Sequence, residues 1–445
     1  MPDGNKRMGL NMRKIVIAGA GSYHFAPAIF EDLFVRFRTP VEVWMVDSDL
    51  DMAELSARAG QALARAFGTE ARFYYTTQLS KATFSADAVI FCADFLDEEA
   101  WKKDLEALDE VGLGKQARLR GGIGGAMQTM RVLDFIADLA TQMSEECPDA
   151  PLIICDSGSG GVQLARACEC AQRICGVRTL GVSGVTEQTK KRLALYLDVK
   201  EEDMRITCAG LNNFCWVSGM TDKNGKDLIA RCKKEMKEDS REELSAQYID
   251  WYDAIPAGER VMLYELLGDT EKSPRKTVLL SGVGLADYEL RKRNLALLTV
   301  HGPLSPKGAK AWGQIRTSGL QSARPVEILR ALWGEGACQV DNLNMPCDGA
   351  IDGVAPGRFV ECPAVIDEGG VRGVHAELPI ELEDLMGQIS LCNVLYAEAA
   401  ATGSRAALRE AMEIDPALSG IDLLYTEGVL SDMMEAQKDK LKRFF

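Results

Sequence analysis

The stretch KIVIAGAGSYHFAP, residues 14–27, decides the fold of this 445-residue chain. It begins as an apolar β run, passes through a glycine turn, and continues as an amphipathic helical pattern from about Ala26 to Phe37. Strand, glycine loop and helix in this order are typical of the phosphate-binding unit of a dinucleotide-binding fold, because the start of the helix offers N–H groups to an anion.

The glycine loop matches the dinucleotide fingerprint in part. Gly19 permits the tight turn and Gly21 lets the backbone approach a pyrophosphate, whereas His24 occupies the third glycine position. Asp47 ends the next β run, VEVWMVD (41–47), where a carboxylate accepts hydrogen bonds from a ribose and favours NAD over NADP. The predicted cofactor-binding residues are Gly19, Gly21, Ser22, Tyr23, His24, Phe25 and Asp47. The alternative interpretation is a tight β–α turn without a ligand.

Further β runs alternate with helical patterns through the first half of the chain. The runs are ARFYYTT (71–77), DAVIFCAD (87–94), PLIICD (151–156) and RTLGVSG (178–184). This alternation predicts an α/β fold with a Rossmann-type, doubly wound, mostly parallel sheet. Such a sheet binds ligands at the carboxyl ends of its strands.

After about residue 200 the pattern changes. Hairpin signals are followed by charged helical stretches, then by a Gly- and Pro-rich β region at 340–380, and finally by helices from 385 onward. We therefore predict a disordered tail at 1–12, an NAD-binding Rossmann domain at 13–200, and an α+β domain at 201–445. The last domain packs intimately on the second and serves substrate binding and oligomerisation.

The composition excludes some functions. Lys and Arg number 51 against 66 Asp and Glu, a formal charge of −15, which argues against nucleic-acid and anionic-membrane partners. No segment approaches the roughly 20 apolar residues of a membrane span, and the first twelve residues lack an apolar signal region. The 13 cysteines show no metal spacing, so we expect free thiols in the cytoplasm.

Two other glycine-rich stretches precede helices, LRGGIGGAMQTMR (119–131) and DSGSGG (156–161). Each is either a second anion contact or a turn that brings a helix close to a strand. Arg131 is a candidate carboxylate or phosphate ligand, with a structural arginine as the alternative. The sequence contains no Cys/His zinc spacing and no G-x-S-x-G elbow, so zinc and serine hydrolase chemistry is not indicated.

Taken in order, these segments resemble one known family. GAGSYHFAPAIFEDL, DEVGLGKQARLRGGIGGAMQTMR, GVSG, GLNNFCW and FVECPAVID are similar to the NAD-dependent glycoside hydrolases of family 4 over nearly the whole chain. The resemblance implies oxidation of a sugar at C3 with NAD⁺, loss of the C2 proton, elimination of the C1 substituent, addition of water and return of the hydride. It also implies a small-molecule glycoside substrate and a homodimer or homotetramer.

The family also holds a divalent metal, usually manganese, through a cysteine in a G-L-C-x motif and a histidine in a G-x-N-H motif. Here Ser183 of GVSG stands where the cysteine is expected, and Asn213 of GLNN stands where the histidine is expected. AGERVMLYEL (257–266) lacks the histidine of a third motif. Serine hydroxyl and asparagine amide are weak neutral ligands, so we predict that the metal is absent and assign no metal ligand.

The resemblance supplies candidates for the chemistry. Glu259 is the first choice for the base that removes the C2 proton, followed by Tyr252 and Tyr264. The alternatives are a surface turn for Glu259 and core aromatics for the tyrosines. Without a metal, hydrogen-bond donors must stabilise the enolate. The candidates for this role are Asn213, which we predict to be catalytic, Ser183, Asn212 and Arg260. The predicted substrate-binding residues are Gln116, Arg131, Ser183, Asn212, Asn213 and Arg260.

The substrate and the reaction leave further alternatives. No cluster of Arg and Lys stands out in the second domain, which favours an unphosphorylated hexoside or hexuronide over a 6-phospho sugar. One alternative function is an NAD-dependent sugar oxidoreductase or epimerase that does not cleave glycosides. Another is a non-catalytic relative that binds NAD or sugar. The glycine loop together with Asp47 weighs against the non-catalytic alternative.

Overall fold

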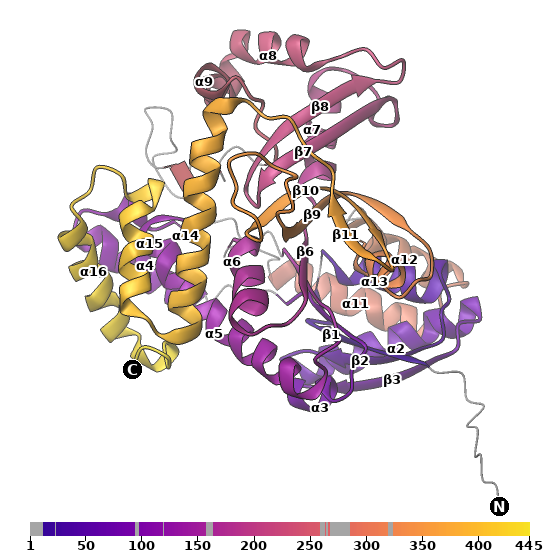
Figure 1. Cartoon of the computed structure of the whole chain (residues 1–445). Coiled ribbons are helices and arrows are strands. Elements are labelled where there is room, and N and C mark those ends of the chain that lie inside the picture. Colours follow the sequence, from indigo (N-terminus) through magenta and orange to yellow (C-terminus); the bar gives the residue numbers. More distant parts are fainter. Residues whose placement is uncertain are drawn as a thin grey trace, which may run out of the picture.

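A computed structural model describes residues 12–22, 24–93, 98–118, 120–156, 163–258, 263, 266–267, 285–318 and 324–445. Within them, an 11-stranded sheet runs through the molecule with helices on both faces (Figure 1). Its strand order is β3-β2-β1-β4-β5-β6-β9-β10-β7-β8, with β11 paired to β10.

The first half of the sheet is parallel. Its strands are β1 (Arg13–Ala18), β2 (Val41–Val46), β3 (Ala71–Thr76), β4 (Ala88–Phe91), β5 (Leu152–Cys155) and β6 (Thr179–Val182). The central strands are short apolar runs because both faces of a parallel sheet are covered. Each β run that the sequence predicted overlaps one of these strands, and the order β3-β2-β1-β4-β5-β6 confirms the Rossmann-type sheet.

The second half is antiparallel and continues the same sheet. Its strands are β7 (Met204–Leu211), β8 (Phe214–Asp222), β9 (Cys338–Pro346), β10 (Phe359–Asp367) and β11 (Gly370–Gly373). Strand β9 joins β6 at the pair Gly181–Asn344, and β10 joins β7 at the pair Glu361–Gly210. The carboxyl end of β6 therefore meets the antiparallel strands at one junction.

Helices cover both faces of this sheet. They are α1 (Ala26–Phe30), α2 (Leu50–Phe67), α3 (Leu79–Thr83), α4 (Glu98–Glu110), α5 (Gly122–Glu146), α6 (Leu164–Glu169), α7 (Val185–Tyr196), α8 (Ile229–Glu238), α9 (Glu243–Tyr252), α11 (Leu285–His301), α12 (Pro306–Ser318), α13 (Pro325–Leu332), α14 (Glu383–Thr402), α15 (Arg405–Ile414) and α16 (Leu423–Ala436). Two π-helical turns, η1 (Glu31–Arg36) and η3 (Cys170–Ile174), extend α1 and α6. Short 3₁₀ turns lie at Gly114–Gln116, Glu201–Asp203, Ser240–Glu242, Ile380–Leu382, Pro416–Leu418 and Lys438–Lys440. The helix predicted from Ala26 to Phe37 is thus α-helical for one turn and π-helical after it.

Two apolar cores lie on the opposite faces of the sheet. Along β1, Ile15 and Ile17 belong to one core and Val16 and Ala18 to the other, as the alternation of side chains in a strand requires. The first core includes residues of α1, α2, α11, α12 and α13, and the second includes residues of α5, α6, α14, α15 and α16. Figure 1 shows α8 and α9 beside the β7–β8 hairpin.

Elements from the second half of the chain pack across the first half. Helix α11 contacts α2, and α14 and α16 contact α5. This arrangement agrees with intimate packing of the two predicted domains, whose boundary near residue 200 stays a prediction. All 13 cysteines are free thiols, and Cys168 and Cys170 are buried where α6 passes into η3. Within the described part of the chain, no helix is both long and apolar enough to cross a membrane.

Candidate functional site

The loop after β1 has the geometry of a dinucleotide-binding turn. Gly19 adopts φ +88°, and a Cβ atom at this position would lie 2.3 Å from the backbone nitrogen of Ala93, so only glycine fits. The N–H groups of Gly19 and Ala20 donate to Val46 O at 2.8 and 3.0 Å, which fastens the loop to the end of β2. The loop leads into the continuous helical segment α1–η1.

Asp47 braces this loop from the end of β2. Its Oδ2 accepts the N–H of Gly21 at 2.9 Å, and its Oδ1 accepts the N–H of Asp49 at 3.1 Å. Each carboxylate oxygen has two lone pairs, so Asp47 can hold the loop and still accept a hydrogen bond from a ribose hydroxyl. The predicted pair of glycine loop and acid is therefore brought together.

The other predicted cofactor-binding residues are Ser22, Tyr23, His24 and Phe25. Ser22 is in the loop, where its Oγ accepts the N–H of Phe25 at 3.3 Å. Phe25 is fully buried in the apolar core, so its side chain serves packing at this position. His24 is half-buried at the entry to α1, and Tyr23 lies outside the described residues.

A buried carboxylate, Glu361 of β10, lies at the centre of the polar groups at the sheet junction. Ser183 Oγ and Asn342 Nδ2 both donate to its Oε1, the latter at 2.7 Å. Asn212 Nδ2 donates to its Oε2 at 3.3 Å and to Asp156 Oδ2 at the same distance. We call these five residues, Asp156, Ser183, Asn212, Asn342 and Glu361, the Glu361 cluster.

The Glu361 side chain is 0% exposed. Burial raises its pKa, because an ion is costly in an apolar interior, and the charge of Asp156 acts in the same direction. The hydrogen bonds from Ser183 and Asn342 act in the opposite direction. The neutral donors around Glu361 therefore compensate in part for a carboxylate held at the junction of the two half-sheets.

Ser183 uses its whole hydrogen-bonding capacity inside this cluster. A hydroxyl has one hydrogen and two lone pairs. The hydrogen goes to Glu361, one lone pair accepts Asn342 Nδ2 at 2.8 Å, and the other accepts the N–H of Val185 at 3.3 Å. Ser183 is also only 3% exposed. The structure therefore does not support the predicted role of Ser183 as a direct substrate ligand.

Asn212 and Asn213 form the two-residue turn of the β7–β8 hairpin. Leu211 pairs with Phe214, and Asn213 adopts φ +63°, a left-handed conformation that asparagine tolerates well. Asn212 is saturated: Oδ1 accepts from Leu164 N at 2.9 Å and from Asn213 Nδ2 at 2.6 Å, and Nδ2 donates to two carboxylates.

Asn213 differs from Asn212 in the hydrogen bonds of its side chain. It is half-buried, and among the described residues its only side-chain hydrogen bond is the one from Nδ2 to Asn212. One N–H and the carbonyl oxygen of its amide are open toward the surroundings. Of the three predicted polar ligands Ser183, Asn212 and Asn213, this residue alone has hydrogen-bonding capacity to offer a substrate.

The two positions expected of metal ligands do not fit a transition metal. Ser183 has no lone pair left, and Asn213 could contact an ion only through its neutral amide oxygen, because its Nδ2 atom donates to Asn212. Both groups are neutral oxygen or nitrogen donors, whereas a cysteine and a histidine would supply a thiolate and an imidazole. Within the described ranges no three side chains among His, Cys, Asp and Glu come together to hold an ion.

Gln116 and Arg131 have partners within the protein. Gln116 is buried, and its Nε2 donates to Ala417 O at 3.2 Å. Arg131 forms an ion pair with Asp104 at 2.6 Å, with the two side chains 6% and 0% exposed, and donates to Gln437 at 3.1 Å. These contacts favour the structural alternative for Arg131, which ties α5 to α4 and to the end of the chain.

Tyr252, at the end of α9, packs edge to face on Trp216 with ring centroids 5.5 Å apart. Trp216 belongs to β8 and is fully buried, and Tyr252 packs against the same apolar core. Burial raises the pKa of the Tyr252 hydroxyl. A core aromatic is therefore the better description of Tyr252 than a catalytic base at neutral pH.

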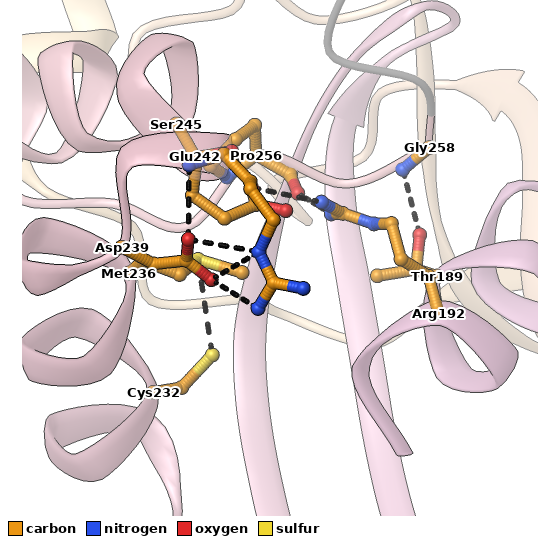
Figure 2. A network of polar contacts seen from close by, with 10 residues as sticks. Thr189, Arg192, Cys232, Met236, Asp239, Glu242, Ser245, Pro256 and Gly258 are labelled. Carbon is orange, nitrogen blue, oxygen red and sulfur yellow. Dashed lines mark hydrogen bonds and ion pairs between the residues drawn. The ribbon is translucent and has the colours of Figure 1, made fainter. Parts of the chain in front are cut away.

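The chain after Tyr252 runs back toward Ser183. Ala257 N donates to Cys215 O at 2.9 Å, so this segment follows β8, and Figure 2 shows the side chains of α7 that hold it. Thr189 accepts the N–H of Gly258 at 2.7 Å, and Arg192 donates to Pro256 O at 2.6 Å.

Gly258 is the last described residue of this segment before the predicted catalytic stretch. A Cβ atom at Gly258 would lie 3.1 Å from Val185 Cγ2, at the start of α7 and two residues from Ser183. Glu259, Arg260 and Tyr264 lie outside the described residues, so their roles stay predictions.

Sequence reasoning missed the central residues of the site, Glu361 and Asn342. The signal for Glu361 was available, because it is a single charged residue in the apolar run FVECPAVI (359–366). A charge inside an otherwise buried strand indicates a paired or functional group. The signal for Asn342 is weak, since its run QVDNLNMP (339–346) is mixed in character.

The fold defines a class: a Rossmann-type α/β protein with a fingerprint loop after β1 and a polar site at the junction with an antiparallel extension. The chain belongs to family 4 of the glycosyl hydrolases. The model of the family 4 glycosyl hydrolases matches residues 14–191, and the model of their C-terminal domain matches residues 208–418. The protein is a glycoside hydrolase, as the resemblance predicted.

Individual relatives are distant in sequence. An alpha-glucosidase of Erwinia rhapontici is 23% identical over 439 residues, covering 90% of this chain and 93% of the relative. An alpha-galacturonidase of Lachnoclostridium phytofermentans is 22% identical over 465 residues, covering 97% of each.

Among solved structures, the 6-phospho-beta-glucosidase of Thermotoga maritima with manganese, NAD⁺ and glucose-6-phosphate has a TM-score of 0.67 at 16% identity. The match covers 96% of this chain and 99% of that one. At this identity the likeness establishes a common fold.

Proposed function

We propose that this protein is an NAD-dependent glycosidase that acts by oxidation at C3, elimination across C1 and C2, hydration and re-reduction, without a metal. Two observations on this family 4 chain carry the proposal. Asp47 braces the fingerprint loop, and Ser183, where the resemblance expects a metal ligand, lies in a hydrogen-bonded cluster. The two features lie at the carboxyl ends of strands of one sheet.

The residues of the loop fit a dinucleotide. Gly19, Gly21 and Ser22 would cradle the pyrophosphate with backbone groups, and Asp47 would accept a hydrogen bond from the adenosine ribose. When bound, NAD⁺ supplies the hydride acceptor for C3 of the sugar and gives the hydride back at the end of the cycle. The protein's part is to hold the loop rigid, which the bonds from Gly19 and Gly21 accomplish.

Asn213 is the group that this proposal assigns to the sugar oxygens. Oxidation at C3 makes the C2 proton acidic, and its removal places negative charge on an oxygen next to the reacting carbons. A donor fixed beside that oxygen lowers the barrier. The open N–H of Asn213 is available for this role, whereas Ser183 and Asn212 act by holding Asn213 and the strand ends in place.

Glu259 is the proposed base at C2. The support comes from the resemblance and from the preceding residue, Gly258, which is held on α7 by Thr189 and lies against Val185. Tyr252 is the weaker candidate, since burial raises its pKa and favours the protonated hydroxyl. Tyr264 and Arg260 stay predictions.

The proposal also covers the substrate, the assembly and the location. The named relatives include an alpha-glucosidase and an alpha-galacturonidase as well as a 6-phospho-beta-glucosidase, so the family does not decide between neutral, uronic and phosphorylated sugars. From the sequence we propose an unphosphorylated hexoside or hexuronide. The resemblance favours a homodimer or homotetramer, and free thiols favour a cytoplasmic location.

One assay tests this function. The protein is incubated with NAD⁺ in D₂O and a panel of nitrophenyl α- and β-glucosides, galacturonides and their 6-phospho counterparts. The proposal predicts release of nitrophenol that requires NAD⁺, and deuterium at C2 of the sugar product. Accumulation of NADH without nitrophenol would identify an oxidoreductase that does not cleave. Bound NAD⁺ with neither reaction would identify a non-catalytic relative.

A further inference from the structure

The orientation of the Asn212 amide is fixed by its surroundings. Its Nδ2 atom faces two carboxylate oxygens, of Asp156 and Glu361, at 3.3 Å each. Its Oδ1 atom faces the N–H of Leu164 at 2.9 Å. Ionised carboxylates only accept and a backbone N–H only donates, so a flipped amide would place like groups against each other at both ends.

The orientation of the Asn212 amide fixes the orientation of the amide of Asn213, the next residue of the turn. Because Asn212 presents Oδ1 on the side of Asn213, the Asn213 amide must turn its Nδ2 inward, and the two atoms lie 2.6 Å apart. The carbonyl oxygen and the second N–H of Asn213 then face away from the cluster. The direction of the Asn213 amide is thus set through Asn212, by Glu361 together with Asp156 and the N–H of Leu164.

The burial of Glu361 makes it suited to fixing the orientation of the Asn212 amide. Its side chain is 0% exposed and comes from β10, whereas its donors come from the segment after β6, from β9 and from the β7–β8 turn. A carboxylate that accepts from three separate elements cannot rotate without breaking several bonds. Both of its oxygens face donors. A glutamine has the same shape, but its NH₂ group would face a donor.

We propose that Glu361 is a positioning residue for Asn213, acting through Asn212 to fix the direction in which the Asn213 amide faces the sugar. The proposal rests on the function proposed above for the reacting sugar, but the link between the three side chains is independent of it. It adds to the site a residue that touches neither sugar nor cofactor.

The perturbation is Glu361→Gln. In whichever orientation the glutamine sits, its Nε2 faces a donor: either Asn212 Nδ2, or Ser183 and Asn342. One mismatched buried pair is expected to lower kcat about 10- to 100-fold, because Asn212 loses its fixed orientation and Asn213 follows. The affinity for NAD⁺, measured by fluorescence titration, stays within about twofold because the cofactor loop makes no contact with Glu361 in the described contacts.

A double-mutant cycle separates positioning from a merely structural effect. E361Q, N213A and E361Q/N213A are compared with the wild type on the nitrophenyl glycoside that the panel identifies. If Glu361 acts through Asn213, the double variant has the kcat of N213A within about twofold. If the two losses multiply, or if E361Q keeps the wild-type kcat, the proposal is overturned.

Glu169→Gln is the matched control. Glu169 is also buried, 1% exposed, and accepts from two donors, the N–H of Phe359 at 2.8 Å and Arg173 Nε at 3.0 Å. Glutamine creates the same kind of mismatch there, at the start of the same strand β10. The variant is expected to lower the melting temperature while its effect on kcat, if any, multiplies with that of N213A.

A second readout does not depend on turnover. In protein labelled with ¹⁵N at asparagine, the side-chain NH₂ signals of Asn213 are assigned by their loss in N213A. The proposal predicts that these signals shift in E361Q and stay in place in E169Q. Unchanged signals in E361Q overturn the positioning role even if the enzyme is active. Shifted signals in a protein that cleaves no glycoside of the panel uphold the role and overturn the proposed function.

Discussion

Replacing Ser183 by alanine separates two roles for this residue. If Ser183 binds the sugar, as its position in the GVSG motif suggests, S183A weakens substrate binding. If Ser183 is held inside the Glu361 cluster, as its three hydrogen bonds indicate, S183A weakens folding and leaves substrate binding alone. The structure predicts the second result.

The size of the effect follows from the bonds that are lost. A hydrogen bond to a charged group contributes about 1.5–3 kcal/mol, and the contacts of Ser183 with Asn342 and Val185 add a smaller amount because Asn342 keeps its bond to Glu361. We expect a loss of about 2–3 kcal/mol in the free energy of unfolding. With an unfolding entropy of about 2.1 cal/mol/K per residue, this corresponds to a fall of about 2–3 °C in melting temperature for a chain of this length.

Ser245→Ala is the matched control for this measurement. Ser245, which lies beside Glu242 in Figure 2, is not a member of the Glu361 cluster; it is 0% exposed and donates to the Glu242 carboxylate at 2.7 Å. Thermal unfolding of both variants is followed by circular dichroism, and KM is measured on the cleaved nitrophenyl glycoside. S183A should be at least as destabilising as S245A, with KM within about twofold of the wild type. A normal melting temperature together with a tenfold higher KM would refute the reasoning.

Three further predictions concern other parts of the molecule. Gly19→Ala places a Cβ atom 2.3 Å from Ala93 N, and we expect the affinity for NAD⁺ to fall at least about tenfold; an unchanged Kd in fluorescence titration would contradict this. Arg131→Ala leaves the buried Asp104 without its cation and should cost about 3–5 kcal/mol in thermal unfolding without changing KM. Burial raises the pKa of Asp32 to about 6, so the folded state keeps a proton that the unfolded chain releases. The wild type should therefore lose stability relative to D32N as the pH rises from about 4 to about 6, and parallel melting curves over that range would exclude the assignment.

The parallel half of the fold was predictable because its signals are local. Each central strand is a short apolar run bounded by turn residues, and the glycine loop lies within nine residues of chain, 19–27. The hairpin signals after residue 200 were local as well, and the structure places the two-residue turn of the β7–β8 hairpin at 212–213. Fold class, strand positions and the pairing of the loop with Asp47 followed from these patterns.

The arrangement of the polar site was not predictable in the same way. Glu361 meets Ser183 and Asn212 across separations of 178 and 149 residues, and no local pattern records such contacts. For the same reason Arg131, placed by sequence beside a glycine loop, pairs with Asp104 and Gln437. Motif position therefore identified Ser183, Asn212 and Asn213, and only the fold showed that Asn213 alone of these three keeps hydrogen-bonding capacity.

The central claim is that the hydrogen-bonded Glu361 cluster replaces a metal in this glycosidase. The most direct test measures kcat on the cleaved nitrophenyl glycoside, with NAD⁺ present, after treatment with EDTA and again after addition of Mn²⁺. The account predicts the same kcat in the untreated, EDTA-treated and Mn²⁺-supplemented enzyme. Loss of activity in EDTA and its recovery with Mn²⁺ would contradict it.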